Sequence, residues 1–396
     1  VCYTLAKNIT DIDESIELYL PPREFLGDLT RTADIENLII WLENLPPVDN
    51  MILSLDTLVY GGLIPSRRSK ETLEELKLRL KRIKPLLEGK NVYAFSSIMR
   101  ISNNNVNQEE KDYWADYGKK IFEYSFNSYK FQKDIKTDVP KEILEDYKNT
   151  RKRNFEINKI YLDWQKEGLF DTLVFSKDDC AEFGFNVQEA RELENLGGFT
   201  KTGADEIPLT LMARAIKGEM KVDIEFIEPE FKDLISNYED ISIEKSVLGQ
   251  LELAGIKVTD KADSDVTLVV NNFKNHQGEI VMKRSTEPFS GEFKLGENMM
   301  IADVRFANGA DNEFVKKFIN SKMPKGFYGY SAWNTSANTL GSLLCGAKVK
   351  FLAKKYNKNA FKKLQAIRLL DDWAYQANVR QTLIKPEKIE MQKYEK

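Results

Sequence analysis

The sequence predicts an α/β protein with a mainly parallel sheet, and two observations support this fold class. Short apolar runs, such as 51–55, 172–175 and 266–270, alternate along the chain with longer helical stretches. Alternation of this kind is typical of parallel strands joined by crossover helices. The runs are continuous in apolar character, as expected for strands that are buried on both faces of a sheet.

The number of expected strands indicates which α/β architecture the chain adopts. Their segments are 51–62, 91–101, 171–179, 222–229, 265–273, 298–311 and 326–339, with a weaker candidate at 15–22. A total of about eight strands favours a (β/α)₈-type barrel with helical insertions. One or more doubly wound open sheets are the alternative.

The segments between the strands predict helices and a domain organisation. Residues 69–87 are expected to form a helix that Ser69 caps, with acidic residues early and basic residues late. We expect a helical insertion at about 105–165, one α/β domain over 1–345 and a C-terminal helical extension over 346–396.

Composition excludes several classes of protein. The chain has 58 basic and 62 acidic residues, a balance that argues against a nucleic-acid partner. Cys2, Cys180 and Cys345 lie far apart, so neither a disulfide framework nor a zinc site is predicted. The single histidine, His276, lies in a polar run and is expected in a solvated loop. No apolar run approaches the ~18 residues that a membrane span needs.

These observations predict a cytoplasmic protein without a membrane partner and without a cofactor. The chain contains neither GxGxxG nor GxxxxGK[ST], so no dinucleotide or P-loop nucleotide is expected. The oligomeric state is left open by the sequence.

Polar residues follow most of the expected strands. Because sites form at the carboxyl ends of parallel strands in both barrels and open sheets, we expect these side chains to surround a ligand. Carboxylates and amides bind hydroxyl groups, and aromatic rings stack on sugars, so the mixture fits a polyhydroxylated ligand. The candidate substrate-binding residues are Asp56, Tyr60, Arg67, Arg100, Asp205, Glu206, Asn272, Asp303, Asn308, Asp311, Trp333, Asn334 and Asn338.

Asp178 and Asp179 are the candidate catalytic residues. They follow the apolar strand 172–175 at the point where it ends, so both side chains can reach one pocket. Close carboxylates repel, and the pair can then supply both an acid and a base, as two-carboxylate glycoside hydrolysis requires. The alternative is structural: the segment 176–185 begins a helix, and Ser176 or Asp178 caps it.

Two further alternatives concern the charges. Arg67 and Arg100 either bind an acidic group of the ligand or pair internally with Asp56 or the Asp178–Asp179 pair, and we expect internal pairing. Aspartates could also supply oxygen ligands to Mg²⁺ or Ca²⁺. No ligand spacing in the sequence indicates such a site, so no metal is predicted.

Six segments together resemble a bacterial family known as domain of unknown function 4127. They are "PPREFLGD", "SLDTLVYGGLIPSR", "SKDDCAEFG", "GADEIPLTLMAR", "DVRFANGAD" and "YSAWNTSANTLG". The resemblance covers nearly the whole chain. The family's pattern begins with a short strand and Asp-Asp-Arg-Pro before the segment matching 1–6, so the resemblance implies that a first strand is missing upstream.

A second resemblance concerns the adjacent aspartates alone. A strand ending in two aspartates is similar to the β-N-acetylhexosaminidases that use the acetamido group of the substrate. This implies that Asp178 orients the acetamide and that Asp179 protonates the leaving oxygen. We therefore expect a carbohydrate-active enzyme that hydrolyses a glycosidic bond. A non-catalytic protein that binds a sugar or sugar acid, or a metal-dependent hydrolase or lyase, is the alternative.

Overall fold

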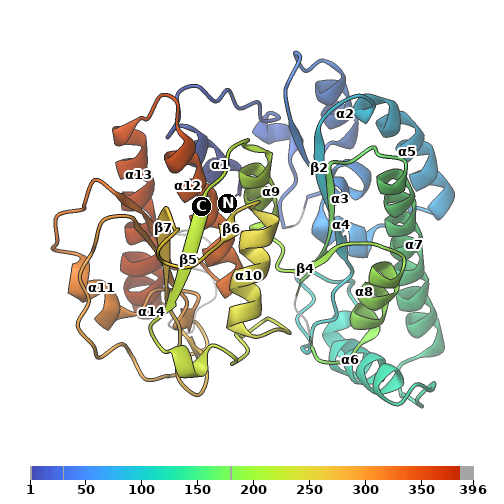
Figure 1. Cartoon of the computed structure of the whole chain (residues 1–396). Helices are drawn as coiled ribbons and strands as arrows, with labels where there is room; N and C mark the ends of the chain where they lie inside the picture. Colours follow the sequence, from blue (N-terminus) through green and yellow to red (C-terminus); the bar gives the residue numbers. More distant parts are fainter. Residues whose placement is uncertain (1, 30, 179–180, 384–396) are drawn as a thin grey trace. The chain divides into compact units, whose positions relative to one another are not determined.

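The chain folds into two compact units in a computed structural model that describes residues 2–29, 31–178 and 181–383 (Figure 1). One unit is formed by Tyr19–Leu211, and the other by Val1–Leu18 together with Met212–Lys396. We call them the inner unit and the outer unit, from their places in the sequence. Helix α12 (Ser336–Leu352) crosses the boundary that the sequence predicted at 345.

The inner unit contains a sheet of four parallel strands. These are β1 (Met51–Ser54), β2 (Val92–Ile98), β3 (Thr172–Lys177) and β4 (Thr200–Thr202), and their order in the sheet is the order in the chain. Right-handed crossovers in this order place the connecting helices on one face. Figure 1 shows α3 (Leu55–Tyr60), α5 (Leu73–Leu87) and α7 (Lys141–Lys166) together on one side of β2.

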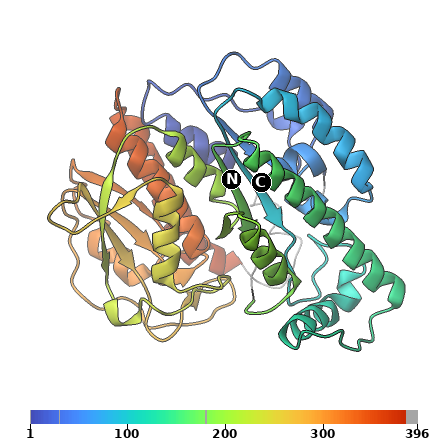
Figure 2. The same cartoon turned by 45° about the vertical axis from the view of Figure 1, so that its right-hand side comes forward.

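Helices α2 (Ile35–Glu43), α4 (Leu63–Arg68), α6 (Trp114–Lys130) and α8 (Phe185–Asn195) complete the inner unit, and α9 (Ile207–Ala215) begins in it. A short 3₁₀ turn, Arg23–Phe25, precedes α2. The long helix α7, green in Figure 2, contacts β2 and β3. Its apolar residues Ile157 and Tyr161 are fully buried in the main core, with Val92 and Phe175 from the strands.

The outer unit contains a sheet of five parallel strands. They are β5 (Lys221–Phe226), β6 (Lys257–Val258), β7 (Val266–Asn271), β9 (Met299–Asp303) and β11 (Phe327–Ser331), in the order β11-β9-β7-β5-β6. The first strand of this sheet therefore lies between the second and the third. This is the flavodoxin-like doubly wound order, which changes direction between β5 and β7.

Helices and short elements surround the outer sheet. They are α1 (Cys2–Thr10), α10 (Ile243–Leu253), α11 (Asn312–Phe318), α12, α13 (Lys358–Arg368) and α14 (Arg380–Leu383), with the 3₁₀ turn Pro229–Phe231 and the small pair β8 (Gly278–Glu279) and β10 (Phe306–Ala307). Figure 1 shows α10 on one side of β5 and α11 on the other. An eleven-residue π-helix, Leu369–Val379, follows α13.

The predicted fold class is confirmed: the protein is α/β with mainly parallel sheets. The expected barrel needs one ring of about eight strands. The pairings of the described residues give a four-stranded sheet, a five-stranded sheet and the small pair β8–β10, a layout consistent with the open-sheet alternative. Within the described part of the chain, no helix is long and apolar enough to cross a membrane.

Two local predictions are wrong. Residues 16–22, inside the weaker strand candidate, form neither helix nor strand. Ser69 does not cap the helix that follows it, because α5 begins at Leu73 and Thr72 caps it in a capping box with Glu75. Ser69 ends α4 instead, and its hydroxyl donates to Glu71 Oε2 at 2.9 Å.

Candidate functional site

The carboxyl ends of β1, β2 and β3 lie side by side in the inner unit. Their in-register pairs include Ser54 with Phe95, and Ser97 with Ser176. Ser54 ends β1, and its hydroxyl accepts a hydrogen bond from the Thr57 amide at 3.3 Å, which starts α3 at once. The next residues of each segment therefore reach the same edge of the sheet, as expected for parallel strands.

Asp56 is buried at this edge. Its side chain is in the first turn of α3, and the residue is 2% exposed. Its Oδ2 accepts a hydrogen bond from the Ser97 amide at 2.8 Å, and its Oδ1 lies 3.2 Å from Ser96 Oγ. Burial raises the pKa of Asp56 to about 6, although the hydrogen bonds from Ser97 and Ser96 lower it.

The neighbours of Ser96 favour a protonated Asp56. Ser96 Oγ also lies 2.8 Å from Asn158 Oδ1, while Asn158 Nδ2 donates to the Ser97 carbonyl at 3.2 Å. The orientation of the Asn158 amide is thereby set, and its Oδ1 can only accept. Ser96 has one hydroxyl proton to donate, so a proton on Asp56 Oδ1 is needed to complete both contacts.

A cluster of two arginines and three acids lies at the same edge. Arg100, which follows β2, donates to Glu110 Oε1 at 3.0 Å, Glu109 Oε2 at 2.5 Å and Asp178 Oδ2 at 3.3 Å. Arg67 of α4 donates to Glu110 Oε1 at 3.1 Å. We call Arg67, Arg100, Glu109, Glu110 and Asp178 the arginine cluster. It confirms the expected internal pairing of Arg100 with Asp178, but Arg67 pairs with Glu110 and not with Asp56 or Asp178.

Asp178 is the described member of the predicted catalytic pair. It comes directly after β3, and its side chain is 22% exposed, so it is reachable from solvent while Arg100 holds it. Asp179 lies outside the described residues.

Asp205 and Glu206 lie where β4 leads into α9. Asp205 is exposed, whereas Glu206 is fully buried and its Oε2 accepts from the Ala204 amide at 3.2 Å. Gly203 leaves room for this carboxylate, because a Cβ atom there would lie 1.9 Å from Glu206 Oε1.

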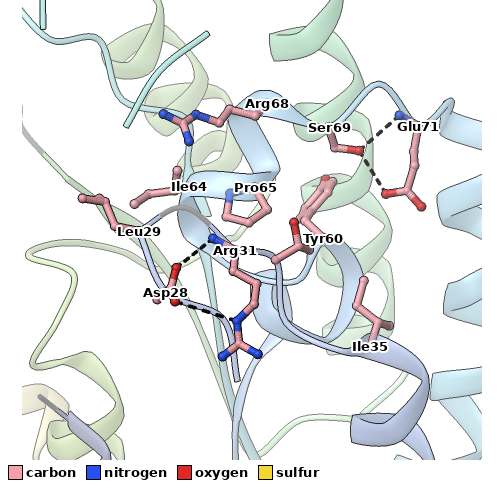
Figure 3. Close-up of a pocket in the computed structure, with 11 residues that line it drawn as sticks. Asp28, Leu29, Arg31, Ile35, Tyr60, Ile64, Pro65, Arg68, Ser69 and Glu71 are labelled. Atoms are coloured by element: carbon pink, nitrogen blue, oxygen red, sulfur yellow. Dashed lines mark hydrogen bonds and ion pairs between the residues drawn. The ribbon is translucent and has the colours of Figure 1, made fainter. Parts of the chain in front are cut away.

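Tyr60 lines a cavity of about 380 Å³ in the inner unit. The ring is buried against the main core, and the hydroxyl has no hydrogen-bond partner among the described residues. Figure 3 shows the walls, where Asp28 pairs with Arg31 and Ser69 with Glu71. Leu29, Ile35, Ile64 and Pro65 supply apolar surface, with Thr32 and Arg68 completing the lining. The cavity thus combines charged, hydroxyl and apolar groups, as ligand pockets do.

The remaining predicted binding residues belong to the outer unit. Asp303 ends β9 and is fully buried, with Asn271 Nδ2 donating to Oδ1 at 2.8 Å, and the Asp311 amide and Tyr330 hydroxyl donating to Oδ2 at 2.9 and 3.0 Å. Burial raises the pKa of Asp303 to about 7, and the nearby Asp311 carboxylate adds to the rise. Asp311 caps α11 by accepting from the Glu313 amide.

Arg305 and Asn272 fill the point where the outer sheet changes direction. Arg305 donates from Nε to Asn271 Oδ1 at 3.0 Å and from Nη2 to Glu228 Oε1 at 2.9 Å. Asn272 exchanges two hydrogen bonds with the backbone of Glu228, at 2.9 and 2.8 Å. These fully buried side chains join the ends of β5, β7 and β9 to one another. Their contacts therefore stabilise the outer sheet.

Asn308 and Asn334 lie together after β10 and β11. Both have left-handed backbone conformations, with φ of 61° and 57°. The backbone amide of Asn308 donates to the backbone carbonyl of Asn334 at 2.7 Å. Trp333 is buried beside Arg368, whose guanidinium carbon lies 5.8 Å from the centre of the indole ring. Asn338 is buried in the first turn of α12, where its backbone amide donates to the hydroxyl of Thr335.

The predicted residues thus form two groups, each within one unit. The inner unit contains Asp56, Tyr60, Arg67, Arg100, Asp178, Asp205 and Glu206, and the outer unit contains Asn272, Asp303, Asn308, Asp311, Trp333, Asn334 and Asn338. Among residues 2–29, 31–178 and 181–383, no group of three or more histidine, cysteine or acidic side chains is arranged to hold a metal ion.

Comparison with known families identifies the family of the chain. A family model with the description "Protein of unknown function (DUF4127)" matches residues 1–395. The chain belongs to this family. No curated protein matches it, and no solved structure does. The family resemblance seen in the six sequence segments is therefore confirmed.

Sequence reasoning missed three important residues of this DUF4127 chain. Glu109 and Glu110 lie in the loop between β2 and α6, away from any strand end, and Asn158 lies in the middle of α7. The sequence contained one indication of the two glutamates. They are adjacent and begin nine residues after Arg100, so the loop that contains them is long enough to return to the edge of the sheet. Asn158 has no such signal, because a single amide on a long helix is ordinary.

Proposed function

We propose that the chain is a carbohydrate-active enzyme that hydrolyses a glycosidic bond, with Asp178 and Asp179 as its catalytic pair. The observation that carries the proposal is the position of Asp178. It is a carboxylate at the carboxyl end of a parallel strand, reachable from solvent and held at 3.3 Å by Arg100. Active sites of parallel α/β proteins form at this edge.

The proposed chemistry divides the work between the two acids. Asp179 donates its proton to the glycosidic oxygen as the bond from that oxygen to the anomeric carbon breaks. Asp178, fixed by Arg100, orients the substituent that stabilises the positive charge on the anomeric carbon. Water then adds to this carbon and returns a proton to Asp179, as two-carboxylate hydrolysis requires.

The cavity of the inner unit supports a ligand rich in hydroxyl groups. The cavity beside Tyr60 provides an aromatic wall together with charged groups. We also propose a cytoplasmic location, which the three dispersed cysteines support.

The test uses Asp178→Asn and Asp179→Asn on a panel of 4-nitrophenyl glycosides, including the N-acetyl-β-glucosaminide and the β-glucuronide. Loss of a general acid or an orienting carboxylate is expected to lower kcat by about 10²–10⁴-fold. Asp163→Asn is the matched control, because that carboxylate is exposed on α7 and belongs to neither the cluster nor the cavity. Wild-type activity in both active-site variants contradicts the catalytic assignment.

A non-catalytic protein that binds a sugar or sugar acid is the second candidate. The arginine cluster favours it, because two guanidinium groups suit a carboxylate ligand whether or not a bond is broken. Calorimetric binding without turnover, unchanged in Asp179→Asn, would identify this function.

A further inference from the structure

Arg67 uses only part of its guanidinium group. Its side chain is 2% exposed, and its Nη1 donates to Glu110 Oε1 at 3.1 Å. Its Nε and Nη2 are also buried, yet neither has a hydrogen-bond partner among the described residues. The N–H bonds of Nε and Nη2 point the same way, and this edge binds a carboxylate through two parallel hydrogen bonds.

In two other buried arginines of the protein, acceptors occupy this edge of the guanidinium group. Arg151 of the inner unit donates from Nε and Nη2 to the two carboxylate oxygens of Glu189, at 2.9 and 2.5 Å. Arg305 of the outer unit donates from the same two atoms to Asn271 and Glu228. Buried donors without partners are rare and costly, so the open edge of Arg67 calls for a partner.

Glu109 marks where that partner can enter. Its Oε2 lies 3.8 Å from Arg67 Nη2, beyond hydrogen-bond distance, and 2.5 Å from Arg100 Nη2. Its side chain is 39% exposed, more than the other four members of the arginine cluster. A ligand carboxylate that replaces the Glu109 carboxylate could therefore reach both arginines, and Glu109 has solvent into which it can turn.

Charge favours a carboxylate over a phosphate in this position. Among the described residues, the two guanidinium groups of the cluster face three carboxylates, those of Glu109, Glu110 and Asp178. Exchange of the Glu109 carboxylate for a singly charged ligand leaves this balance unchanged. A doubly charged phosphate adds one negative charge beside Glu110 and Asp178, which is unfavourable at such short distances.

We propose that Arg67 and Arg100 bind the carboxylate of an acidic sugar, which displaces the side chain of Glu109. This inference rests on the proposed carbohydrate function and specifies its substrate class. Because Arg100 also holds Asp178, a carboxylate bound here places the sugar beside Asp178. Arg67 is then the residue that distinguishes an acidic sugar from a neutral one.

Calorimetric titration of the full chain tests the proposal with three probes: D-glucuronate, D-glucose 6-phosphate and D-glucose. We expect wild type to bind glucuronate at least about tenfold more tightly than glucose, and more tightly than the phosphate. Arg67→Lys keeps the charge but lacks the two-donor edge, so we expect its affinity for glucuronate to fall about tenfold.

Glu109→Gln gives a second and opposite readout. It weakens the competing carboxylate at an exposed position, so we expect glucuronate to bind about three- to tenfold more tightly than to wild type. This variant keeps the proposal testable if Arg67→Lys does not fold, which thermal melting by circular dichroism reveals. Arg305→Lys and Glu74→Gln are the matched controls, one at a buried arginine with an occupied edge and one at an exposed glutamate.

The possible outcomes distinguish the carboxylate site from the proposed hydrolysis. Equal affinity for glucuronate and glucose, no binding of glucuronate, tighter binding of the phosphate, or weaker glucuronate binding by Glu109→Gln overturns the carboxylate site. Glucuronate preference that depends on Arg67, without cleavage of any glycoside, supports the site and counts against hydrolysis. Cleavage of neutral glycosides that depends on Asp178 or Asp179, without glucuronate preference, supports hydrolysis and overturns the site.

Discussion

Replacing Asp56 by asparagine should stabilise the inner unit near neutral pH. An asparagine can place its Oδ1 where Asp56 Oδ2 accepts from the Ser97 amide at 2.8 Å. Its Nδ2 then lies where Asp56 Oδ1 meets Ser96 Oγ, and it donates to that hydroxyl. Ser96 remains free to donate to Asn158, so these three hydrogen bonds form without a titrating proton.

The magnitude follows from the pKa of Asp56. Burial raises this pKa from the ordinary value of 3.8 to about 6. Between these values the folded chain binds the proton and the unfolded chain does not, so the free energy of unfolding falls as pH rises. At 1.36 kcal/mol for each pH unit, the loss reaches about 3 kcal/mol above pH 6. Asp56→Asn avoids this loss.

The assay is urea denaturation of wild type and Asp56→Asn between pH 4 and pH 7.5, followed by tryptophan fluorescence. The difference between the two proteins removes the contributions of other titrating groups. We expect the free energy of unfolding of Asp56→Asn to exceed that of wild type by an amount that increases with pH, up to about 3 kcal/mol. Asp163→Asn, which changes an exposed carboxylate, should show no such trend. A pH-independent difference, or a variant less stable than wild type at pH 7.5, would refute the reasoning.

Two further substitutions test the same physical reasoning elsewhere. At pH 4, where the raised pKa of Asp303 has not yet lowered the stability of wild type, Asp303→Asn should destabilise the protein by about 1–3 kcal/mol in urea denaturation. Whichever oxygen of Asp303 its Nδ2 replaces, that nitrogen cannot accept the hydrogen bonds donated there. Stability equal to wild type would contradict this hydrogen-bond assignment. Gly203→Ala should cost about 2–3 kcal/mol, since φ is +116° and the new Cβ would meet Glu206 Oε1. Gly197→Ala, also at positive φ but in open space, should cost only about 1 kcal/mol. Similar losses in the two glycine variants would show that backbone strain alone, and not the carboxylate of Glu206, explains Gly203.

The strands were predictable because each is an apolar run long enough to identify by itself. The runs at 51–55, 172–175 and 266–270 became β1, β3 and β7 with little change in their bounds. The failures are segments in which local pattern and tertiary context disagree. Residues 16–22 have strand-like composition but form no strand, and β4 has only three residues, too few for a recognisable pattern.

The candidate site was predictable only in outline. The rule that polar residues gather at strand ends located Asp56, Arg100 and Asp178 at one edge of one sheet. It could not identify the partners, because Arg67 is 43 residues from Glu110 in the chain and Ser96 is 62 residues from Asn158. It also expected Asp303 and Asp178 to reach one ligand, although Asp303 is fully buried among donors and Asp178 is reachable from solvent.

The sequence by itself determined the main strands and helices and the parallel arrangement of the strands, since these follow from local patterns of apolar and polar residues. Tertiary structure alone decided how the strands are divided between two sheets, and therefore which polar ends meet. Strand order depends on hydrogen bonds between backbones that every sequence supplies equally, so it leaves no mark on composition. The Nε and Nη2 of Arg67, unpaired among the described residues, are likewise a feature that the sequence does not reveal. It exists because folding buried an arginine beside a single well-placed acceptor, and only the coordinates of both groups reveal it.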